Sequence, residues 1–219
     1  MLNRSQSGPV PETKRKLIDA GVSLMRQRGF NATTVDDICS EAGVTKGGFF
    51  HYFKSKDDLA AAAVVRFHEL KAAELAQAPF RRLADPLDRV FGRLEFAKQS
   101  GGGIKSVTRG CLIGMFAQEL SFTHAPLRTI CQDKFAAIAK DFEMDLAEAK
   151  ALHAPGATFD PSSVAALYVS IVQGSLMLAK ASESNRVLFE NLEQFRSYLQ
   201  SLFSPGRKGK VSARATATV

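Results

Sequence analysis

Apolar residues recur at three- and four-residue intervals along most of the chain, which is the spacing of amphipathic helices. In the amino-terminal third, turn signals interrupt this pattern. Gly29 and Gly43 each follow a periodic stretch, where glycine commonly ends a helix. Thr34 and Ser55 are each followed three residues later by an aspartate, a pairing that satisfies free amides at a helix start. The predicted helices of this part span residues 13–29, 34–42, 45–52 and 55–77.

The remainder of the chain keeps the helical spacing, and no strand pattern competes with it. Turn-forming residues at 100–110, 124–126 and 153–161 separate the helices of this part. These helices are expected over residues 86–98, 111–122, 127–152, 162–181 and 187–203. The sequence therefore predicts an all-α fold of about nine helices. A flexible polar arm over residues 1–12 precedes it, and a disordered basic tail over residues 204–219 follows it.

The predicted helix over residues 45–52 is poor by itself. It is short and contains Gly47 and Gly48, each of which costs roughly 1 kcal/mol relative to alanine in a helix interior. Phe49 and Phe53 share one face, so neighbouring helices can hold the segment through these two rings. The faces that point away from this core carry Lys46, Gly47, Phe50 and His51.

That arrangement is typical of a helix held against the DNA major groove. Lys46 can donate to a guanine edge or a phosphate, Phe50 can contact a thymine methyl group, and His51 can donate to either. An ordinary glycine-linked hairpin of core helices is the alternative, but it does not explain why these side chains gather away from the core. Hydroxyl and ammonium groups at the neighbouring helix ends suit phosphate oxygens. They belong to Thr33, Thr34, Tyr52, Lys54 and Lys56.

The charge of the chain agrees with DNA binding but does not carry that prediction. The 219 residues have a formal net charge of +7, yet residues 204–219 alone hold four basic residues and no acidic one. With 45% apolar residues the chain can bury a core. It shows neither a secretory signal nor an unbroken apolar run of membrane-spanning length, so we expect a cytoplasmic protein without a membrane partner.

Enzymatic and metal chemistry find no support in the sequence. Cys39, Cys111 and Cys131 are odd in number and form no CxxC pair, so we expect reduced thiols and no zinc site. The chain has no glycine-rich phosphate loop after a strand, no HExxH and no GxSxG, and its four histidines are scattered. We therefore expect no enzyme activity, no metal and no cofactor.

The stretch GVTKGGFFHYFKSKDDL, downstream of TTVDDI, resembles the amino-terminal DNA-binding domain of TetR-type transcriptional repressors over about residues 13–60. The resemblance implies a helix-turn-helix DNA-binding domain over residues 13–59 and a helical ligand-binding and dimerisation domain over residues 60–203. Family members often carry tyrosine where this chain has Phe50, so a phenol cannot bond a phosphate there. The resemblance places DNA contacts on Thr33, Thr34, Thr45, Lys46, Gly47, Gly48, Phe50, His51, Tyr52 and Lys56.

The stretch RGCLIGMFAQELS, residues 109–121, is similar to the LmrA and YxaF type of drug-responsive repressors in that family. Phenylalanine and methionine residues of the second part suit an adaptable pocket for a small lipophilic effector, although core packing is the simpler role for any one of them. Cys111 begins a predicted helix, where amide dipoles favour a reactive thiolate, so an electrophile or redox sensor is an alternative. The candidate ligand contacts are Phe91, Phe96, Cys111, Met115, Phe116, Phe122, Phe142 and Met177.

The last two predicted helices suit a homodimer interface. Residues 162–181 are apolar nearly all round, and such a helix needs cover on more than one face. With residues 187–203 they can form a four-helix contact of two helices per subunit, an internal core helix being the alternative. The leading hypothesis is a dimeric repressor that reads a palindromic operator and is released by a small effector. A regulator without a ligand and a helical interaction protein without DNA binding are the other interpretations.

Overall fold

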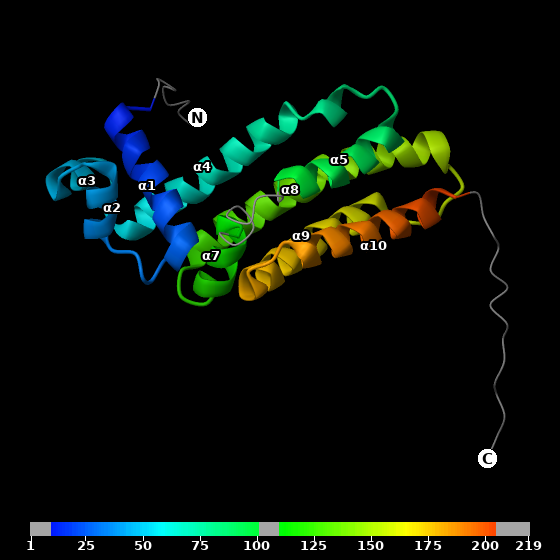
Figure 1. Ribbon diagram of the computed structural model, residues 1–219. Coiled ribbons are helices and arrows are strands. Elements are labelled where there is room, and N and C mark those ends of the chain that lie inside the picture. Colours follow the sequence, from blue (N-terminus) through cyan, green and yellow to red (C-terminus); the bar gives the residue numbers. More distant parts are fainter. Residues whose placement is uncertain (1–9, 101–109, 205–219) are drawn as a thin grey trace, which may run out of the picture.

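The computed structural model describes residues 10–100 and 110–204, and the regular elements within them are all helical. In these two ranges, nine α-helices and one short 3-10 helix form an elongated molecule, with α2 and α3 at one end and the paired α9 and α10 toward the other (Figure 1). The α-helices are α1 (Glu12–Arg28), α2 (Val35–Ala42), α3 (Lys46–Tyr52), α4 (Lys56–Ala76), α5 (Pro86–Ser100), α7 (Leu112–Leu120), α8 (Ala125–His153), α9 (Pro161–Ser182) and α10 (Arg186–Phe203). The 3-10 helix η1 is Pro79–Arg82.

The all-α prediction is confirmed, and each predicted helix has a counterpart whose ends lie close to the expected ones. α8 begins at Ala125, inside a segment expected to be a break, because Pro126 stands in its first turn, where the missing N–H is harmless. η1 is an element that the periodicity does not predict. The predicted arm and basic tail lie outside the described residues except at their inner ends, where Glu12 already belongs to α1.

The cap signals in the sequence shape the turns around α2 and α4. Thr34 caps α2 through a capping box: its hydroxyl accepts from the Asp37 amide at 3.1 Å, and the Asp37 carboxylate accepts from the Thr34 amide at 2.8 Å. Gly43 then ends α2 in the left-handed conformation, with φ 64°. Ser55 caps α4 by accepting from the Asp58 amide at 3.1 Å. These caps fix sharp turns on both sides of α3.

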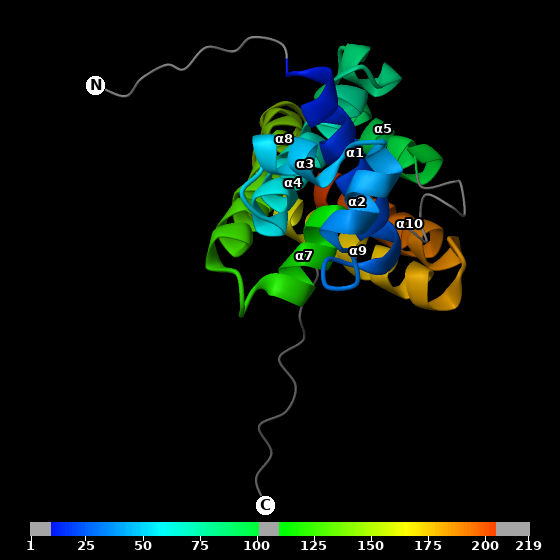
Figure 2. The same ribbon diagram turned by 90° about the vertical axis from the view of Figure 1, so that its left-hand side faces the viewer.

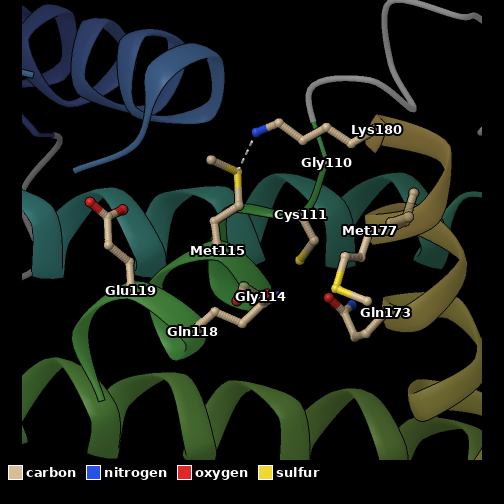
Figure 3. A pocket seen from close by; sticks show the side chains of 10 residues that line it. Gly110, Cys111, Gly114, Met115, Gln118, Glu119, Gln173, Met177 and Lys180 are labelled. Carbon is tan, nitrogen blue, oxygen red and sulfur yellow. Dashed lines mark hydrogen bonds between the residues drawn. The ribbon is translucent and has the colours of Figure 1, made fainter. Parts of the chain in front are cut away.

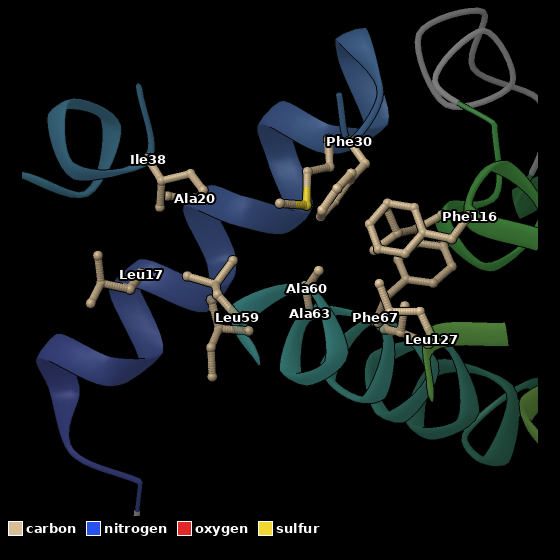
Figure 4. Packing of buried hydrophobic residues seen from close by; sticks show 14 of the residues in the cluster. Leu17, Ala20, Phe30, Ile38, Leu59, Ala60, Ala63, Phe67, Phe116 and Leu127 are labelled. Carbon is tan, nitrogen blue, oxygen red and sulfur yellow. The ribbon is translucent and has the colours of Figure 1, made fainter. Parts of the chain in front are cut away.

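One hydrophobic core joins the first four helices to α7 and the start of α8. Leu17 of α1 and Leu59 of α4 belong to it, together with Phe116 of α7 and Leu127 of α8 (Figure 4). Phe30, in the connection between α1 and α2, packs edge-on against Phe116, with the ring centroids 5.9 Å apart. The helix-turn-helix segment therefore shares its core with helices that lie far downstream in the sequence.

A second hydrophobic core lies between α5, α8, α9 and α10. At its edge, arginine side chains form salt bridges with carboxylates. Arg93 is 2% exposed and donates to Asp141, to which Arg81 also donates. Asp145 accepts from Arg81 at 3.1 Å and from Arg89 at 3.0 Å. Ionic groups at this depth persist only when they are paired. The cluster ties η1 and α5 to the long helix α8.

α9 and α10 keep an apolar face uncovered. Leu167, Met177 and Leu178 of α9 are exposed, as is Tyr198 of α10. Among the described residues, α9 is the one helix that is long and apolar enough to cross a membrane by length and composition, although serines and a glutamine interrupt its apolar positions. Only 28% of its apolar window is buried, although α9 packs on α8 and α10. No other described helix covers the remaining apolar surface of α9, so this surface is available to a partner.

Candidate DNA interface and effector pocket

One face of α3 packs against the core of the protein, and the opposite face is exposed to solvent. Phe49 is fully buried, and Thr45 caps the helix by accepting from the Gly48 amide at 3.1 Å. A Cβ atom at Gly48 would lie 2.7 Å from Val44 Cγ1, whereas a Cβ atom at Gly47 would meet nothing closer than 3.9 Å. Gly48 is therefore a packing requirement of the turn, and Gly47 leaves the outer surface of α3 open to a close approach.

The exposed surface of α3 carries the residues that the sequence predicts as DNA readers. Lys46, Gly47, Phe50 and His51 are all exposed, and Phe50 keeps 56% of its surface open. Lys46 Nζ lies 2.8 Å from Asp36 Oδ1, and the hydrogen bond and charge of Asp36 raise the pKa of Lys46. Figure 2 views the molecule from the end that presents α2 and α3.

Hydroxyl groups and one further cation flank this surface. Thr34 and Thr45 are exposed, although both hydroxyls also cap helices. Tyr52 is half-buried, with its ring 4.7 Å from the His51 ring between centroids. Lys54 is exposed in the turn that leads into α4. The structure thus brings these predicted phosphate contacts to the rim of the α3 surface.

Two predicted DNA contacts turn inward, and the expectation for them is corrected. Thr33 is 0% exposed, and its hydroxyl donates to the Gly29 carbonyl at 2.7 Å. Lys56 Nζ donates to the carbonyl oxygens of Phe30 and Thr33, both at 2.9 Å, and lies 4.0 Å from the centre of the Phe30 ring. The carbonyls of this part of the chain therefore engage the Thr33 hydroxyl and two of the three N–H donors of Lys56 that were expected to bind phosphates.

A pocket opens between α7 and α9 (Figure 3). Its volume is ≈ 350 Å³, within the range of small-molecule sites. Cys111, Met115 and Met177, three of the predicted ligand contacts, are among the residues that line it. The lining consists of Gly110, Cys111, Gly114, Met115, Gln118, Glu119, Gln173, Leu176, Met177 and Lys180.

The other predicted ligand contacts do not line this pocket. Phe116 is buried in the first core and Phe142 in the second. Phe122 is 99% exposed in the turn after α7. Phe91 packs against the second core, and Phe96 packs on η1. Phe91, Phe96, Phe116 and Phe142 therefore serve packing, which was the simpler role for each of them, whereas Phe122 serves neither a core nor this pocket.

Polar side chains, which the sequence did not indicate as ligand contacts, also line the pocket. Gln118 and Lys180 are exposed there, and Gln173 is half-buried. Lys180 Nζ has the Met115 sulfur 3.8 Å away (Figure 3). These groups can donate hydrogen bonds to a ligand whose body rests on thioether sulfur and methyl groups.

Cys111 is the half-buried N-cap residue of α7 and faces the pocket. Cys131 is buried, and burial together with the neighbouring Cys111 raises the pKa of the Cys131 thiol to about 11. Cys131 is therefore protonated and inert at neutral pH, whereas Cys111 is accessible. In the described part of the chain, no cluster of three histidine, cysteine or acidic residues is arranged to hold a metal ion.

Two hydrogen-bonded contacts tie the pocket wall to the end of α1. The Glu119 carboxylate accepts from the backbone amides of Phe30, at 2.9 Å, and Asn31, at 2.8 Å. The Arg26 guanidinium donates to the carbonyl oxygen of Gly110 at 2.9 and 3.2 Å. Glu119 and Gly110 both line the pocket and lie at opposite ends of α7.

Comparison with known proteins agrees with this architecture. Residues 17–63 match the model of the bacterial regulatory proteins of the tetR family, and residues 100–194 match the LmrA/YxaF-like transcriptional regulator C-terminal domain. The uncharacterised HTH-type transcriptional regulator YxaF of Bacillus subtilis (strain 168) is 24% identical over 84% of this chain and 93% of its own. The HTH-type transcriptional repressor DhaR of Mycobacterium sp. (strain GP1) is 26% identical over 83% of this chain and 87% of its own.

A solved structure gives the same picture. The regulatory protein TetR from Rhodobacter sphaeroides superposes with a TM-score of 0.76 at 25% identity, covering 85% of this chain and 98% of its own. Such proteins are DNA-binding transcriptional regulators and not enzymes. The chain therefore belongs to the TetR family, with a carboxy-terminal domain of the LmrA/YxaF-like type.

Proposed function

We propose that the protein is a cytoplasmic homodimeric repressor that binds a palindromic operator through α3 and is released by a small effector bound between α7 and α9. In this proposal residues 13–59 read DNA, and residues 60–203 bind the effector and dimerise. The observation that carries the proposal is the exposed surface of α3, where Lys46, Phe50 and His51 surround the bare Gly47. A core that reaches from α1 to α7 connects this surface to the pocket.

The surface of α3 has the chemistry to read base edges. Lys46 can donate to a guanine edge, His51 can donate to a base or a phosphate, and Phe50 can contact a thymine methyl group. Thr34, Tyr52 and the amides at the start of α4 can bind the flanking phosphates. Two such surfaces about 34 Å apart, roughly one turn of DNA, would read two half-sites.

The uncovered face of α9 and α10 supports a homodimer. Leu167, Leu178 and Tyr198 are exposed on it, and two copies of the face can form a four-helix contact about a twofold axis. We expect Leu178→Glu to raise the dimer dissociation constant about a hundredfold or more, since the contact would bury an unpaired carboxylate. Sedimentation at several protein concentrations measures this change. Leu152→Glu, on an exposed leucine of α8, is the matched control.

The pocket favours an effector that has an apolar body and a hydrogen-bond acceptor. Met115 and Met177 offer adaptable apolar contacts, while Gln118, Gln173 and Lys180 can donate hydrogen bonds. In one conformation of the dimer, the spacing of the two α3 helices would not fit the two half-sites. An effector that binds this conformation more tightly shifts the population away from the DNA-bound form. The shift cannot exceed its difference in affinity for the two conformations.

The test of DNA recognition begins with an operator selected from random duplexes by the wild-type protein. We expect Lys46→Ala with His51→Ala to abolish preference for that duplex, while the dimer and the melting temperature stay unchanged because both side chains are exposed. Lys140→Ala with His153→Ala, an exposed pair at other sites on α8, is the matched control. Operator affinity equal to that of wild type in the α3 double variant would refute the proposal.

Sensing of electrophiles through a thiol is a second candidate function, because the accessible Cys111 lines the same pocket. In that case an electrophile would act by forming a bond to the Cys111 sulfur rather than by reversible binding. Cys111→Ser separates the two cases. A reversible effector still releases the operator from this variant, whereas an electrophile no longer does.

A further inference from the structure

Glu119 lies where the pocket meets the DNA-binding helices. We propose that this residue transmits occupation of the pocket to α2 and α3, by holding or releasing the segment that connects α1 to α2. This inference rests on the proposed effector site, and it assigns the regulation of that site to one carboxylate. Glu119 acts in it as a positioning residue, because it touches the connecting segment and not the DNA.

The carboxylate holds the connecting segment by a two-point contact. Its two oxygen atoms accept separately from successive backbone amides, Oε2 from Phe30 at 2.9 Å and Oε1 from Asn31 at 2.8 Å. Hydrogen bonds to an ionised carboxylate are stronger than neutral ones, and two of them fix orientation as well as distance. Gly29 has φ 87°, and a Cβ atom there would lie 3.1 Å from Oε2, so the carboxylate sits directly against the turn.

The segment held by Glu119 leads straight into α2. Lys56 of α4 binds the same segment by donating to the carbonyl oxygens of Phe30 and Thr33. Thr34, the next residue, caps α2, which packs on α3. The connection between α1 and α2 is thus clamped between α7 and α4. Loss of the α7 side of the clamp frees the start of α2 and changes how α3 is presented.

The same carboxylate belongs to the pocket wall. Glu119 lies in the last turn of α7, and its side chain points toward the blue ribbon of the DNA-binding helices (Figure 3). Gly114 and Met115, one to two turns earlier on α7, face the pocket. α7 is a short helix, so a ligand that moves its middle also moves Glu119. Backbone amides that lose a carboxylate partner exchange with water instead.

A second contact joins the same elements and offers an alternative route. Arg26 donates to the carbonyl oxygen of Gly110 at the start of α7. Its long side chain can follow a displaced carbonyl by changing rotamer, and its contact with Gly110 reaches α1 itself rather than the connection between α1 and α2. Glu119 binds amides of the connection itself, so it has the more direct hold on α2.

The experiment uses a covalent probe in place of the unidentified effector. N-ethylmaleimide adds to the accessible Cys111 and places its ring in the pocket, while Cys39 and Cys131 are buried. In the full-length protein we expect labelling to weaken binding to the selected operator by at least about tenfold, a typical allosteric coupling. In Glu119→Gln, which cannot accept from both amides, we expect the loss on labelling to fall to about twofold or less. Cys111→Ser controls for labelling elsewhere.

Hydrogen exchange at the Phe30 and Asn31 amides gives a readout that needs no DNA. We expect labelling of wild type to raise exchange at these two amides by about tenfold or more, and Glu119→Gln to raise it without the label. Glu143→Gln, in an i,i+3 pair with Lys140 on α8, is the matched control and should behave as wild type in both measurements.

The possible outcomes separate the inference from the proposed function. Equal loss of operator affinity on labelling wild type and Glu119→Gln would overturn the role of Glu119 and leave the effector pocket standing. Amides of Phe30 and Asn31 that stay protected in labelled wild type would overturn it as well. If labelling changes neither affinity nor exchange in wild type, both the pocket as an effector site and the inference fall.

Discussion

Lys46 Nζ and Asp36 Oδ1 lie 2.8 Å apart, so the first residue of α3 is paired with a carboxylate of α2 on the surface proposed to meet DNA. Both side chains are exposed, and the pairing raises the pKa of Lys46. A phosphate or base must compete with Asp36 for this ammonium group. In the DNA-free protein the carboxylate therefore restrains the lysine that is expected to read.

Removing this restraint should strengthen DNA binding. We expect Asp36→Asn to raise affinity for DNA about twofold to fivefold at low salt, because it frees Lys46 and removes a negative charge facing phosphates. The gain should shrink as salt is added. Binding isotherms at several salt concentrations measure it. The same gain in a Lys46→Ala background would show that the two residues do not interact.

Lys56 should matter for stability rather than for phosphate binding. Its ammonium group donates to two carbonyl oxygens of the α1–α2 connection and lies over the Phe30 ring. We expect Lys56→Met to lower the free energy of unfolding by about 2 kcal/mol through loss of charge-assisted hydrogen bonds. Denaturant unfolding measures this. The exposed Lys54→Met is the control, and a stable Lys56→Met protein with weaker, less salt-dependent DNA binding would restore the phosphate role.

The two glycines of α3 should respond oppositely to alanine. At Gly47 a methyl group meets only the Thr45 hydroxyl oxygen, at 3.9 Å, so we expect Gly47→Ala to stabilise the free protein by up to about 1 kcal/mol through helix propensity and to weaken operator binding by obstructing the surface. At Gly48 a methyl group would press on Val44 Cγ1, so Gly48→Ala should destabilise the protein. Thermal unfolding together with operator binding measures both. Equal melting temperatures for the two variants would contradict the packing at Val44.

Asp141 should make stability depend on pH in the acid range. Burial would raise its pKa, but the hydrogen bonds and charges of Arg93 and Arg81 outweigh burial and hold the pKa of Asp141 below its ordinary value of 3.8. The ionised carboxylate therefore stabilises the fold above that value, and this contribution disappears as the pH falls through the lowered pKa.

Asp141→Asn isolates this contribution. We expect it to cost about 1–2 kcal/mol near neutral pH and to flatten the loss of stability as the pH falls below about 4. Urea midpoints across this range measure the effect. Parallel pH profiles for wild type and Asp141→Asn would show that the carboxylate titrates with the same pKa in the folded and unfolded chains.

Local signals in the sequence predicted most of the fold and the outer surface of α3. Helical spacing, the caps at Thr34 and Ser55, and the left-handed Gly43 each depend on residues a few positions apart. The inward role of Lys56 depends on carbonyl oxygens more than twenty positions away, at Phe30 and Thr33. Residue type alone cannot show that a lysine donates its hydrogen bonds to carbonyl oxygens of distant residues rather than to DNA phosphates.

The pocket was less predictable for a related reason. Cys111, Met115 and Met177 are soft side chains typical of ligand sites, and the structure brings them together. Phe116 and Phe142 follow the same helical spacing but fill cores, since periodicity marks the buried face of a helix without telling which neighbour covers it. Glu119 gives no signal in sequence, because its partners are backbone amides almost ninety positions upstream.

The shared core also limits how the protein can be re-engineered. Phe30 packs on Phe116, and the amide of Phe30 is held by Glu119, so the DNA-reading unit is completed by a helix from the other half of the chain. A chimaera in which the DNA-binding domain of another protein replaces the residues before residue 60 would lose both contacts at once. To change operator specificity without loss of function, α7 must therefore be transferred together with the DNA-binding domain, or the substitutions must be restricted to the exposed side chains of α3.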